Sequence, residues 1–316
     1  MNNLITDIKS LELDTIKNLK NSRATNTLRA YQADFKDFSS FCIKNNFSSM
    51  PTEPKIITLY LTHLSKYSKF STLKRRIASI SVIHKMKGHY LDTKHPLIME
   101  NLHGIKRTLG SRQKSKKPIL INDLKKIIEC ILQENTDKKN IKSRNKEIDK
   151  YRNKALILLG FAGGFRRSEL VSIDHEDIEF VTEGVKILIK RSKTDQSGEG
   201  IVKAIPYFDN HEFCPVIALK EYIKNKDTSK IKGKIFEISD KSVALIIKKY
   251  AEKAGLDSSK YAGHSLRSGF ATSTAESGAE ERDIMAMTGH KTTQMVRRYI
   301  QEANLFKNNA LNKIKI

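Results

Sequence analysis

The chain has 316 residues, of which 58 are Lys or Arg and 35 are Asp or Glu, so its formal net charge is +23. This length predicts two domains, and 39% hydrophobic residues suffice for their cores, which excludes a mainly disordered protein. No apolar run is long enough to span a bilayer and the first residues do not resemble a signal peptide, so we expect a cytoplasmic protein whose charge suits nucleic acid or an acidic membrane surface.

The first hundred residues predict a small helical bundle. Apolar residues recur every three or four positions over residues 25–41 and 56–64, and again from Ser71, a candidate helix cap, to a stop at Gly88. No acidic residue occurs over 54–91, whereas many Lys and Arg do. We interpret this block as a surface that contacts phosphates rather than a merely solvated one.

A second acid-free stretch, residues 101–122, is interpreted as a basic linker between domains. We therefore expect a helical DNA-binding domain over 1–107, a linker over 108–118 and a second domain over 119–316. The candidate DNA-binding residues are Lys66, Lys69, Lys74, Arg75, Arg76, Lys106, Arg107, Arg112 and Lys114.

The second domain begins with a predicted helix over 120–132, followed by a charged segment, 135–150, interpreted as an exposed excursion. A buried helix over 155–161 breaks at Gly163 and Gly164, and another begins near Ser168. Alternating patterns at 178–180, 185–189 and 202–207 predict three antiparallel strands, and helical patterns follow at 216–224, 242–254 and 280–287. The expected fold class is thus mainly α with a small antiparallel β-meander (α+β).

Four segments combine cationic or hydrogen-bonding side chains with breaks in the helical pattern: 164–170, 190–194, 263–267 and 289–299. Arg166 stands at a predicted helix start, which disfavours a cation and indicates a negative group nearby. Glu169, one turn later, is a candidate partner. His264 and Arg267 share a face if their segment is helical. Each feature alone is typical of an ordinary structural contact.

Taken in order, Arg166, Lys193, His264, Arg267, His290 and Tyr299 resemble the catalytic hexad of the tyrosine recombinase, or phage integrase, family. The resemblance is carried by Gly-Phe-Arg-Arg-Ser-Glu-Leu at 164–170, a hairpin lysine, His-Ser-Leu-Arg at 264–267, and Gly-His at 289–290 with a tyrosine nine positions after the histidine. It covers most of the chain. It implies a two-domain, Xer/Cre-like architecture, with an N-terminal SAM-like core-binding domain and a catalytic domain that ends in a helical tail.

Three assignments within the hexad leave alternatives open. Lys193 competes with Lys190 and Arg191, because the hairpin turn is inferred from pattern alone. Arg167 competes with Arg166, although the spacing to the following glutamate favours Arg166. His290 occupies a position where some relatives carry Trp.

The residue types suit attack on a DNA phosphodiester. Guanidiniums of Arg166 and Arg267 offer planar, bidentate donors to phosphate oxygens. A tyrosine, with an ordinary pKa of about 10, needs positive charge and a proton acceptor, for which His264 is the candidate. Lys193 is the candidate acid for the departing 5′ oxygen, His290 donates to the phosphate, and Glu169 orients its neighbours. The resemblance implies a 3′-phosphotyrosyl intermediate at Tyr299.

We expect a site-specific DNA recombinase that performs integration, excision or resolution without ATP, metal or another cofactor. Its partner is double-stranded DNA, bound between the two domains with an affinity that falls steeply with salt. By the resemblance, we expect a homotetramer on paired sites, formed from protomers that are monomeric when free, and accessory DNA-bending proteins are candidate partners. The tail has apolar residues at helical spacing, Leu305, Phe306, Ala310, Leu311 and Ile314. Two alternatives stay open for it: packing against its own catalytic domain, or docking on a neighbouring protomer as in relatives, which we favour. The alternatives are a type IB topoisomerase-like relaxing enzyme and a catalytically silent DNA-binding relative.

Overall fold

The computed structural model describes residues 23–110, 115–134, 141–192, 195, 198–226, 232–303 and 310–314, together with positions 10, 11, 14, 15, 17 and 18. The chain divides into two compact units, Met1–Lys114 and Ser115–Ile316. The boundary falls inside the 108–118 segment interpreted as a linker. No helix among the described residues is both long and apolar enough to cross a bilayer.

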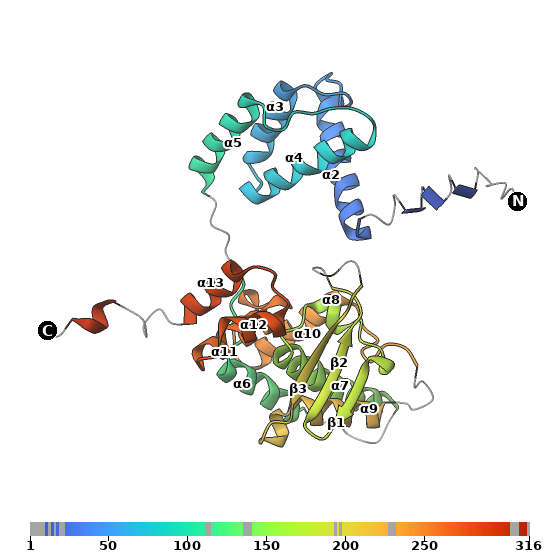
Figure 1. The fold of residues 1–316 in the computed structure, drawn as a ribbon, viewed down its shortest axis with the longest axis vertical. Helices are drawn as coiled ribbons and strands as arrows, with labels where there is room; N and C mark the ends of the chain where they lie inside the picture. The colour runs from blue at the N-terminus through green and yellow to red at the C-terminus, as the bar shows by residue number, and fades with distance from the viewer. Residues whose placement is uncertain are drawn as a thin grey trace, which may run out of the picture. The chain divides into compact units, whose positions relative to one another are not determined.

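In the described part of the first unit, helices α2 (Thr25–Lys44), α3 (Pro54–Ser65), α4 (Phe70–Met86) and α5 (Pro96–Leu109) pack together (Figure 1). Proline at the first position starts α3 and α5, where its missing N–H costs no hydrogen bond. The helices meet through buried Phe38, Ile57, Leu61, Leu73 and Ile80. The three helices predicted from apolar spacing are therefore confirmed.

The interpretation of residues 101–122 as linker was wrong over its first part, because α5 runs to Leu109. Ile98, Leu102 and Ile105 recur at helical spacing and are buried in the core of the first unit. The linker interpretation rested on the absence of acidic residues from 101–122, which does not exclude a helix. The helix ends at Gly110, whose φ of +70° suits glycine.

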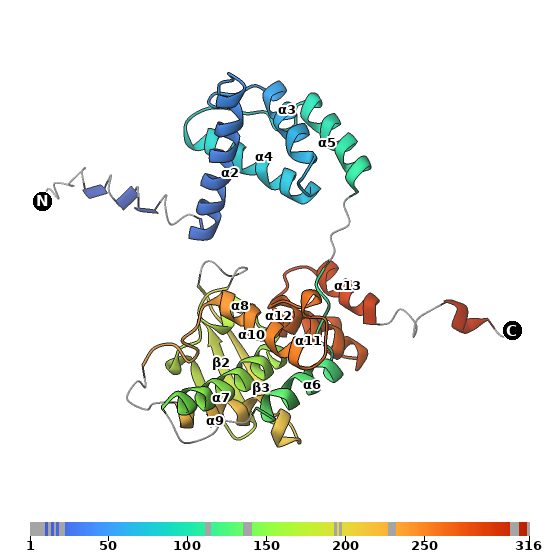
Figure 2. The ribbon, with the colours of Figure 1, turned by 180° about the vertical axis from the view of Figure 1, so that it is seen from behind.

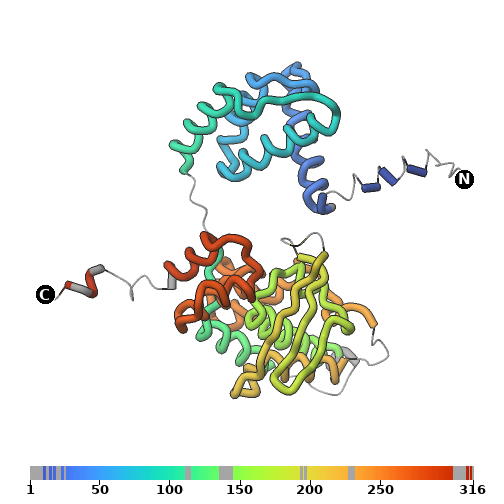
Figure 3. Tube along the Cα trace, viewed as in Figure 1, coloured from blue at the N-terminus to red at the C-terminus, as the bar shows by residue number. Residues whose placement is uncertain are grey.

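The second unit is a three-stranded antiparallel sheet with helices packed on one of its faces. The strands, in the order β1-β2-β3, are β1 (Ile178–Val181), β2 (Gly184–Ile189) and β3 (Ile201–Pro206). The helices are α6 (Ile121–Leu132), α7 (Ile141–Ala162), α8 (Arg167–Leu170), α9 (Pro215–Asn225), α10 (Asp240–Lys253), α11 (His264–Glu276), α12 (Glu281–Thr288) and α13 (Thr293–Ala303). Figures 1 and 2 show α7 and α9 against one face of the sheet, and Figure 3 shows the opposite face. The predicted fold class and meander are confirmed.

The interpretation of residues 135–150 as an exposed excursion was wrong from residue 141 onward, where α7 begins. The first turns of α7 are polar, but Ile148 and Tyr151 pack against the core of the second unit. Two inward-facing apolar residues are too few to predict an amphipathic helix from the sequence. Residues 135–140 lie outside the described part of the chain.

Helix α11 runs through the centre of its unit, and ten of its thirteen residues are buried. It is rich in small residues, which allows close approach: a Cβ at Gly269 would lie 2.0 Å from the backbone oxygen of Ile119. This approach fixes the position of α11 against the segment before α6. All three cysteines are free thiols: Cys42 and Cys214 are buried, whereas Cys130 is partly exposed.

Candidate active site

The first functional arginine lies in the turn that joins α7 to α8. Arg166 precedes α8, and its backbone N–H donates to Glu169 Oε2 at 2.9 Å. Its guanidinium donates to Glu169 Oε1 at 2.5 Å and to the carbonyl of Gly289 at 3.4 Å. Glu169 is 2% exposed, so its buried carboxylate supplies the negative group that the sequence led us to expect beside Arg166.

Arg167, the alternative to Arg166, points elsewhere. Its guanidinium donates to the Asp240 carbonyl at 3.5 Å and lies 3.9 Å from the carboxylate of the same residue. A Cβ at Gly263 would clash with the Arg167 side chain, so the glycine leaves room for it. Between the two, the contacts with Glu169 favour Arg166.

Arg267, on α11, is the largest fully buried side chain of the described residues, at 1% exposure. Its Nη1 donates to the carbonyl of Gly164 at 2.8 Å. Its Nε and Nη2 are buried without a hydrogen-bond partner among the described residues. Burial, reinforced by Arg166, lowers the pKa of Arg267 to about 10, against the opposing effect of Glu169. Two unsatisfied guanidinium nitrogens indicate that an acceptor belongs beside them.

The candidate nucleophile and its candidate base lie next to each other. Tyr299, on α13, has its hydroxyl 3.4 Å from Nε2 of His264, the first residue of α11. The tyrosine ring packs beside Ala271, Ala275 and Val296, which hold α13 against α11. The structure thus joins two side chains that are 35 positions apart in the sequence.

His290 follows Gly289, whose φ of +61° ends α12. The Thr288 hydroxyl donates its proton to the Ile284 carbonyl at 2.6 Å, so at 2.8 Å it accepts from Nδ1–H of His290. Burial, with the charges of Arg267 and Arg166, lowers the pKa of His290 to about 4. Near neutral pH the free imidazole therefore presents an unprotonated Nε2, and it donates to a phosphate only after taking up a proton.

Arg166, His264, Arg267 and His290 share a cavity of about 570 Å³. Its lining consists of Arg166, Arg167, Ser168, Asp240, Gly263, His264, Arg267, His290, Lys291, Thr292 and Met295. Cations and hydrogen-bond donors dominate this lining, which suits an anion such as a phosphodiester. Among the described residues, no group of three or more His, Cys, Asp or Glu side chains is placed to hold a metal ion.

The proposed general acid, Lys193, lies outside the described residues. Of its two alternatives, Lys190 is engaged by three carboxylates: Asp174 at 3.2 Å, Glu176 at 2.7 Å and Asp177 at 2.9 Å. These carboxylates, beginning with Glu176, raise the pKa of Lys190. A lysine held in this way is unsuited to proton donation.

The candidate DNA-binding residues of the first unit differ in their surroundings. Lys66 and Lys69 are exposed at the junction of α3 and α4, Lys74 is exposed on α4, and Lys106 and Arg107 are exposed in the last turn of α5. Arg112 and Lys114 lie outside the described residues.

The two arginines of α4 are ion-paired with α2. Arg75 contacts the buried Asp34, and Arg76 lies 3.3 Å from Asp34 and 2.7 Å from Asp37. Arg76 is mainly buried, whereas the Arg75 side chain is 47% exposed. These pairs connect the two helices, so the lysines are the more accessible candidates for phosphate contact.

Sequence reasoning missed two residues beside this site. Thr288 fixes the tautomer of His290. Lys203, on β3, is 4% exposed and donates to the carbonyl of Gly163 at 2.6 Å. The available signal for Lys203 was a cation at an inward position of a predicted strand, sharing its face with Ile205.

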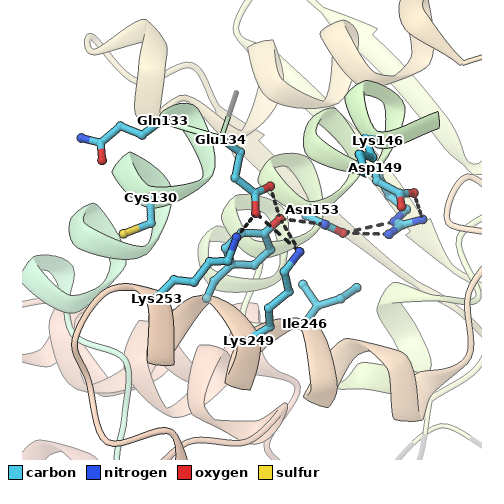
Figure 4. Close-up of a pocket in the computed structure, with 11 residues that line it drawn as sticks. Cys130, Gln133, Glu134, Lys146, Asp149, Asn153, Ile246, Lys249 and Lys253 are labelled. Carbon is cyan, nitrogen blue, oxygen red and sulfur yellow. Dashed lines mark hydrogen bonds and ion pairs between the residues drawn. The ribbon is translucent and has the colours of Figure 1, made fainter. Parts of the chain in front are cut away.

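A larger hollow, of about 840 Å³, lies away from these residues, between α6, α7 and α10. Figure 4 shows Lys249 and Lys253 of α10 directed at Glu134. The Tyr250 hydroxyl donates to the same carboxylate at 2.8 Å, and Asn153 donates to that hydroxyl at 3.2 Å. Burial raises the pKa of Glu134, but these hydrogen bonds and charges outweigh it and the net shift is downward. The charged residues that line the hollow include both signs: Lys249 and Lys253 contact Glu134, and Arg152 lies 2.5 Å from Asp149.

A family model and several known proteins resemble this chain over most of its length or of its second unit. The model of the phage integrase family matches residues 132–305. An "Integrase/recombinase xerD homolog" of Selenomonas ruminantium is 40% identical over 98% of this chain and 91% of its own length. A "Tyrosine recombinase XerC" of Staphylococcus aureus is 25% identical over 94% of this chain and 92% of its own.

Two solved structures share the fold. XerH site-specific recombinase bound to palindromic difH substrate, in a post-cleavage complex, gives a TM-score of 0.57 at 16% identity, covering 82% of this chain and 73% of that one. A lambda integrase dimer bound to a COC′ core site gives a TM-score of 0.55 at 18% identity, and the match covers 96% of this chain and 98% of that one.

Proposed function

The chain belongs to the phage integrase family, the tyrosine recombinases, and from that premise we propose that Tyr299 is the nucleophile with which it cuts and rejoins DNA at specific sites. The single observation that carries this assignment is the Tyr299 hydroxyl 3.4 Å from His264 Nε2, beside a cavity lined by Arg166 and Arg267. A hydroxyl nucleophile, a base and two phosphate-binding cations are the parts that such a reaction needs.

In the cleavage step, the Tyr299 oxygen attacks the phosphorus and its proton passes to His264. The bond from phosphorus to the 5′ oxygen breaks, which leaves a 3′-phosphotyrosyl link on the protein and a 5′-hydroxyl on the DNA. Lys193 supplies the proton for that 5′ oxygen. Attack by a 5′-hydroxyl of another strand reverses these bonds and rejoins DNA without ATP, because the phosphotyrosyl ester conserves the phosphodiester energy.

The cations stabilise the charge that develops on the phosphate. The unpaired Nε and Nη2 of Arg267 are the natural donors to one pair of oxygens, and Arg166, held by Glu169, donates to the same group. His290, protonated as the phosphate binds, adds a third donor. Because its Nδ1 is held by Thr288, only Nε2 can serve this purpose.

Double-stranded DNA is the partner. Exposed lysines of the first unit, Lys66, Lys69 and Lys74, together with Lys106 and Arg107, contact its backbone, while the second unit carries out the chemistry. The active assembly is a homotetramer on two paired sites, formed from protomers that are monomeric when free and aided by DNA-bending proteins. The palindromic substrate of the XerH complex and the dimer in the lambda integrase complex support a two-fold arrangement of protomers. The protein acts on DNA in the cytoplasm of a prokaryotic cell.

The experiment starts from a duplex selected by repeated gel shift with the full-length chain from a random pool, here called the selected duplex. A nick close to the cleavage position lets a short fragment diffuse away and traps the covalent product. Wild type is expected to form an SDS-resistant adduct, and Tyr299→Phe to bind equally well but form none. Adduct formation by Tyr299→Phe would place the nucleophile elsewhere.

A second measurement separates recombination from DNA relaxation. Plasmids carrying two selected duplexes are expected to recombine, with a rate that rises steeply with protein concentration because four protomers act together. Relaxation of a plasmid that lacks the selected duplex, at a rate linear in protein, would instead support a type IB topoisomerase-like enzyme.

A further inference from the structure

A buried lysine beside the active site has no part in the chemistry described so far. Lys203 lies on β3 opposite Ile187 of β2, on the inward face of the sheet, and is 4% exposed. Its ammonium donates to the Gly163 carbonyl at 2.6 Å and lies 4.4 Å from the centroid of the Phe165 ring. Lysine is almost never buried to this degree unless its charge is paired. The burial of the Lys203 ammonium against a carbonyl group therefore suggests a specific role for this residue.

The hydrogen bond of Lys203 connects β3 to the end of α7. The carbonyls of Gly163 and Gly164 follow the last residue of this helix, where the helix dipole places partial negative charge. Lys203 binds the first carbonyl, and Arg267 binds the second at 2.8 Å. One cation from β3 and one from α11 therefore hold consecutive carbonyls of the same turn.

This turn is tightly determined. Gly164 has a φ of +53°, and a Cβ at Gly163 would lie 2.1 Å from the Phe165 ring. Arg166 comes two residues after Gly164 in the chain, and Arg267 is bonded to the turn itself. A displacement of the Gly163 carbonyl consequently moves both guanidiniums that face the scissile phosphate.

Several charged groups surround the ammonium. They are Glu169 of α8, Arg166 at the start of α8, Arg267 of α11 and His290 after α12, while Ile187 of β2 faces it with an apolar side chain. Burial lowers the pKa of Lys203 to about 7, the two arginines add to this effect, and Glu169 opposes it. The ammonium of Lys203 therefore loses its proton near neutral pH.

We propose that Lys203 is a positioning residue for DNA cleavage: through the Gly163 carbonyl it holds the end of α7, and thereby Arg166 and Arg267, in the geometry that the phosphate requires. The proposal rests on the assignment of these two arginines as phosphate ligands. The charged ammonium holds the carbonyl more strongly than the neutral amine does, because a charge-assisted hydrogen bond is the stronger one.

The test compares full-length wild type with Lys203→Met, Lys203→Arg and a matched control. Lys186→Met changes a lysine on the neighbouring strand whose side chain is exposed and paired with Glu179 at 3.5 Å. Each protein is assayed for thermal unfolding, for affinity to the nicked selected duplex, and for the single-turnover rate of adduct formation from pH 6 to pH 9.

Lys203→Met is expected to fold and bind DNA, since methionine fills the same space without a buried charge. It is expected to cleave about 10–100-fold more slowly than wild type at pH 6, the scale of one lost charge-assisted hydrogen bond. The ratio of the two rates should shrink as pH rises and wild type loses its ammonium proton. Lys203→Arg should cleave faster than Lys203→Met, and Lys186→Met should match wild type.

Three outcomes would overturn the proposal: equal cleavage by wild type and Lys203→Met, a deficit of the same size at every pH, or loss of DNA binding by Lys203→Met. If Lys203→Met does not fold, the cleavage rate of wild type is compared with that of Lys203→Arg instead. The ratio of the wild-type rate to the Lys203→Arg rate must fall as the pH rises, and a constant ratio contradicts the proposal. Failure of wild type to form a Tyr299-dependent adduct would instead contradict the proposed function.

Discussion

Replacing Arg267 by lysine keeps a nominal positive charge but removes the planar fork of donors. The guanidinium binds Gly164 through Nη1 and leaves Nε and Nη2 for the phosphate, whereas one ammonium cannot serve both directions. Burial lowers the pKa of Arg267 to about 10. A lysine begins from an ordinary pKa of about 10.4, so the same burial leaves it only partly charged near neutral pH.

The magnitude follows from the two phosphate contacts that are lost. At about 1.5–3 kcal/mol for each hydrogen bond to a charged group, Arg267→Lys loses about 3–6 kcal/mol of transition-state stabilisation. This loss corresponds to a rate about 10²–10⁴-fold lower. The single-turnover rate of adduct formation on the nicked selected duplex measures it, with DNA affinity determined in parallel by gel shift.

A matched control makes the same substitution at an exposed site. The Arg282 side chain on α12 is 88% exposed, so Arg282→Lys is expected to cleave at the wild-type rate. If Arg267→Lys cleaved within a few-fold of wild type, the bidentate role of the guanidinium would be refuted, because charge alone would then suffice.

Three further predictions concern packing, pH and salt. Gly269→Ala places a methyl group against the Ile119 carbonyl and is expected to lower the free energy of unfolding by about 1–3 kcal/mol, which a lower Tm would show. An unchanged Tm would contradict the close approach of α11 to the Ile119 backbone. The pKa of His290 is lowered to about 4, so the unfolded chain binds more protons than the folded one between pH 4 and 6.5, and the free energy of unfolding falls as the pH drops through this window. Denaturant titrations of His290→Gln should show a shallower fall with pH than wild type. Equal falls in the two proteins would refute the lowered pKa. Changing Lys66 and Lys74 together to Gln should reduce the slope of log affinity against log salt by about 1.8, and an unaltered slope would remove them from the phosphate contacts.

Much of the site could be predicted because its groups lie in short local motifs. Arg166 to Glu169 and His264 to Arg267 each span four residues, about one helical turn, so their spacing indicates that the two members of each pair lie close together. The strands were predictable for the same reason, since alternation is a local signal. The contact between Tyr299 and His264 was different: its two members were chosen from the family resemblance, and only the packing of α13 on α11 brings them to 3.4 Å.

What could not be predicted depends on packing between distant segments. Lys203 is 40 positions from the carbonyl it binds, and on a strand its side chain looks like one more basic residue of a basic chain. The helix over Pro96–Leu109 was missed because the acid-free composition of residues 101–122 favoured a linker, although Ile98, Leu102 and Ile105 recur at helical spacing.

The most direct test of the central claim is the chemical identity of the amino acid linked to the cut strand. Adduct trapped on the nicked selected duplex is digested with nuclease and trypsin, and the modified peptide is sequenced by mass spectrometry. The account predicts a nucleotide attached through its 3′ phosphate to the Tyr299 oxygen. A link to any other residue, or to a 5′ phosphate, would contradict it.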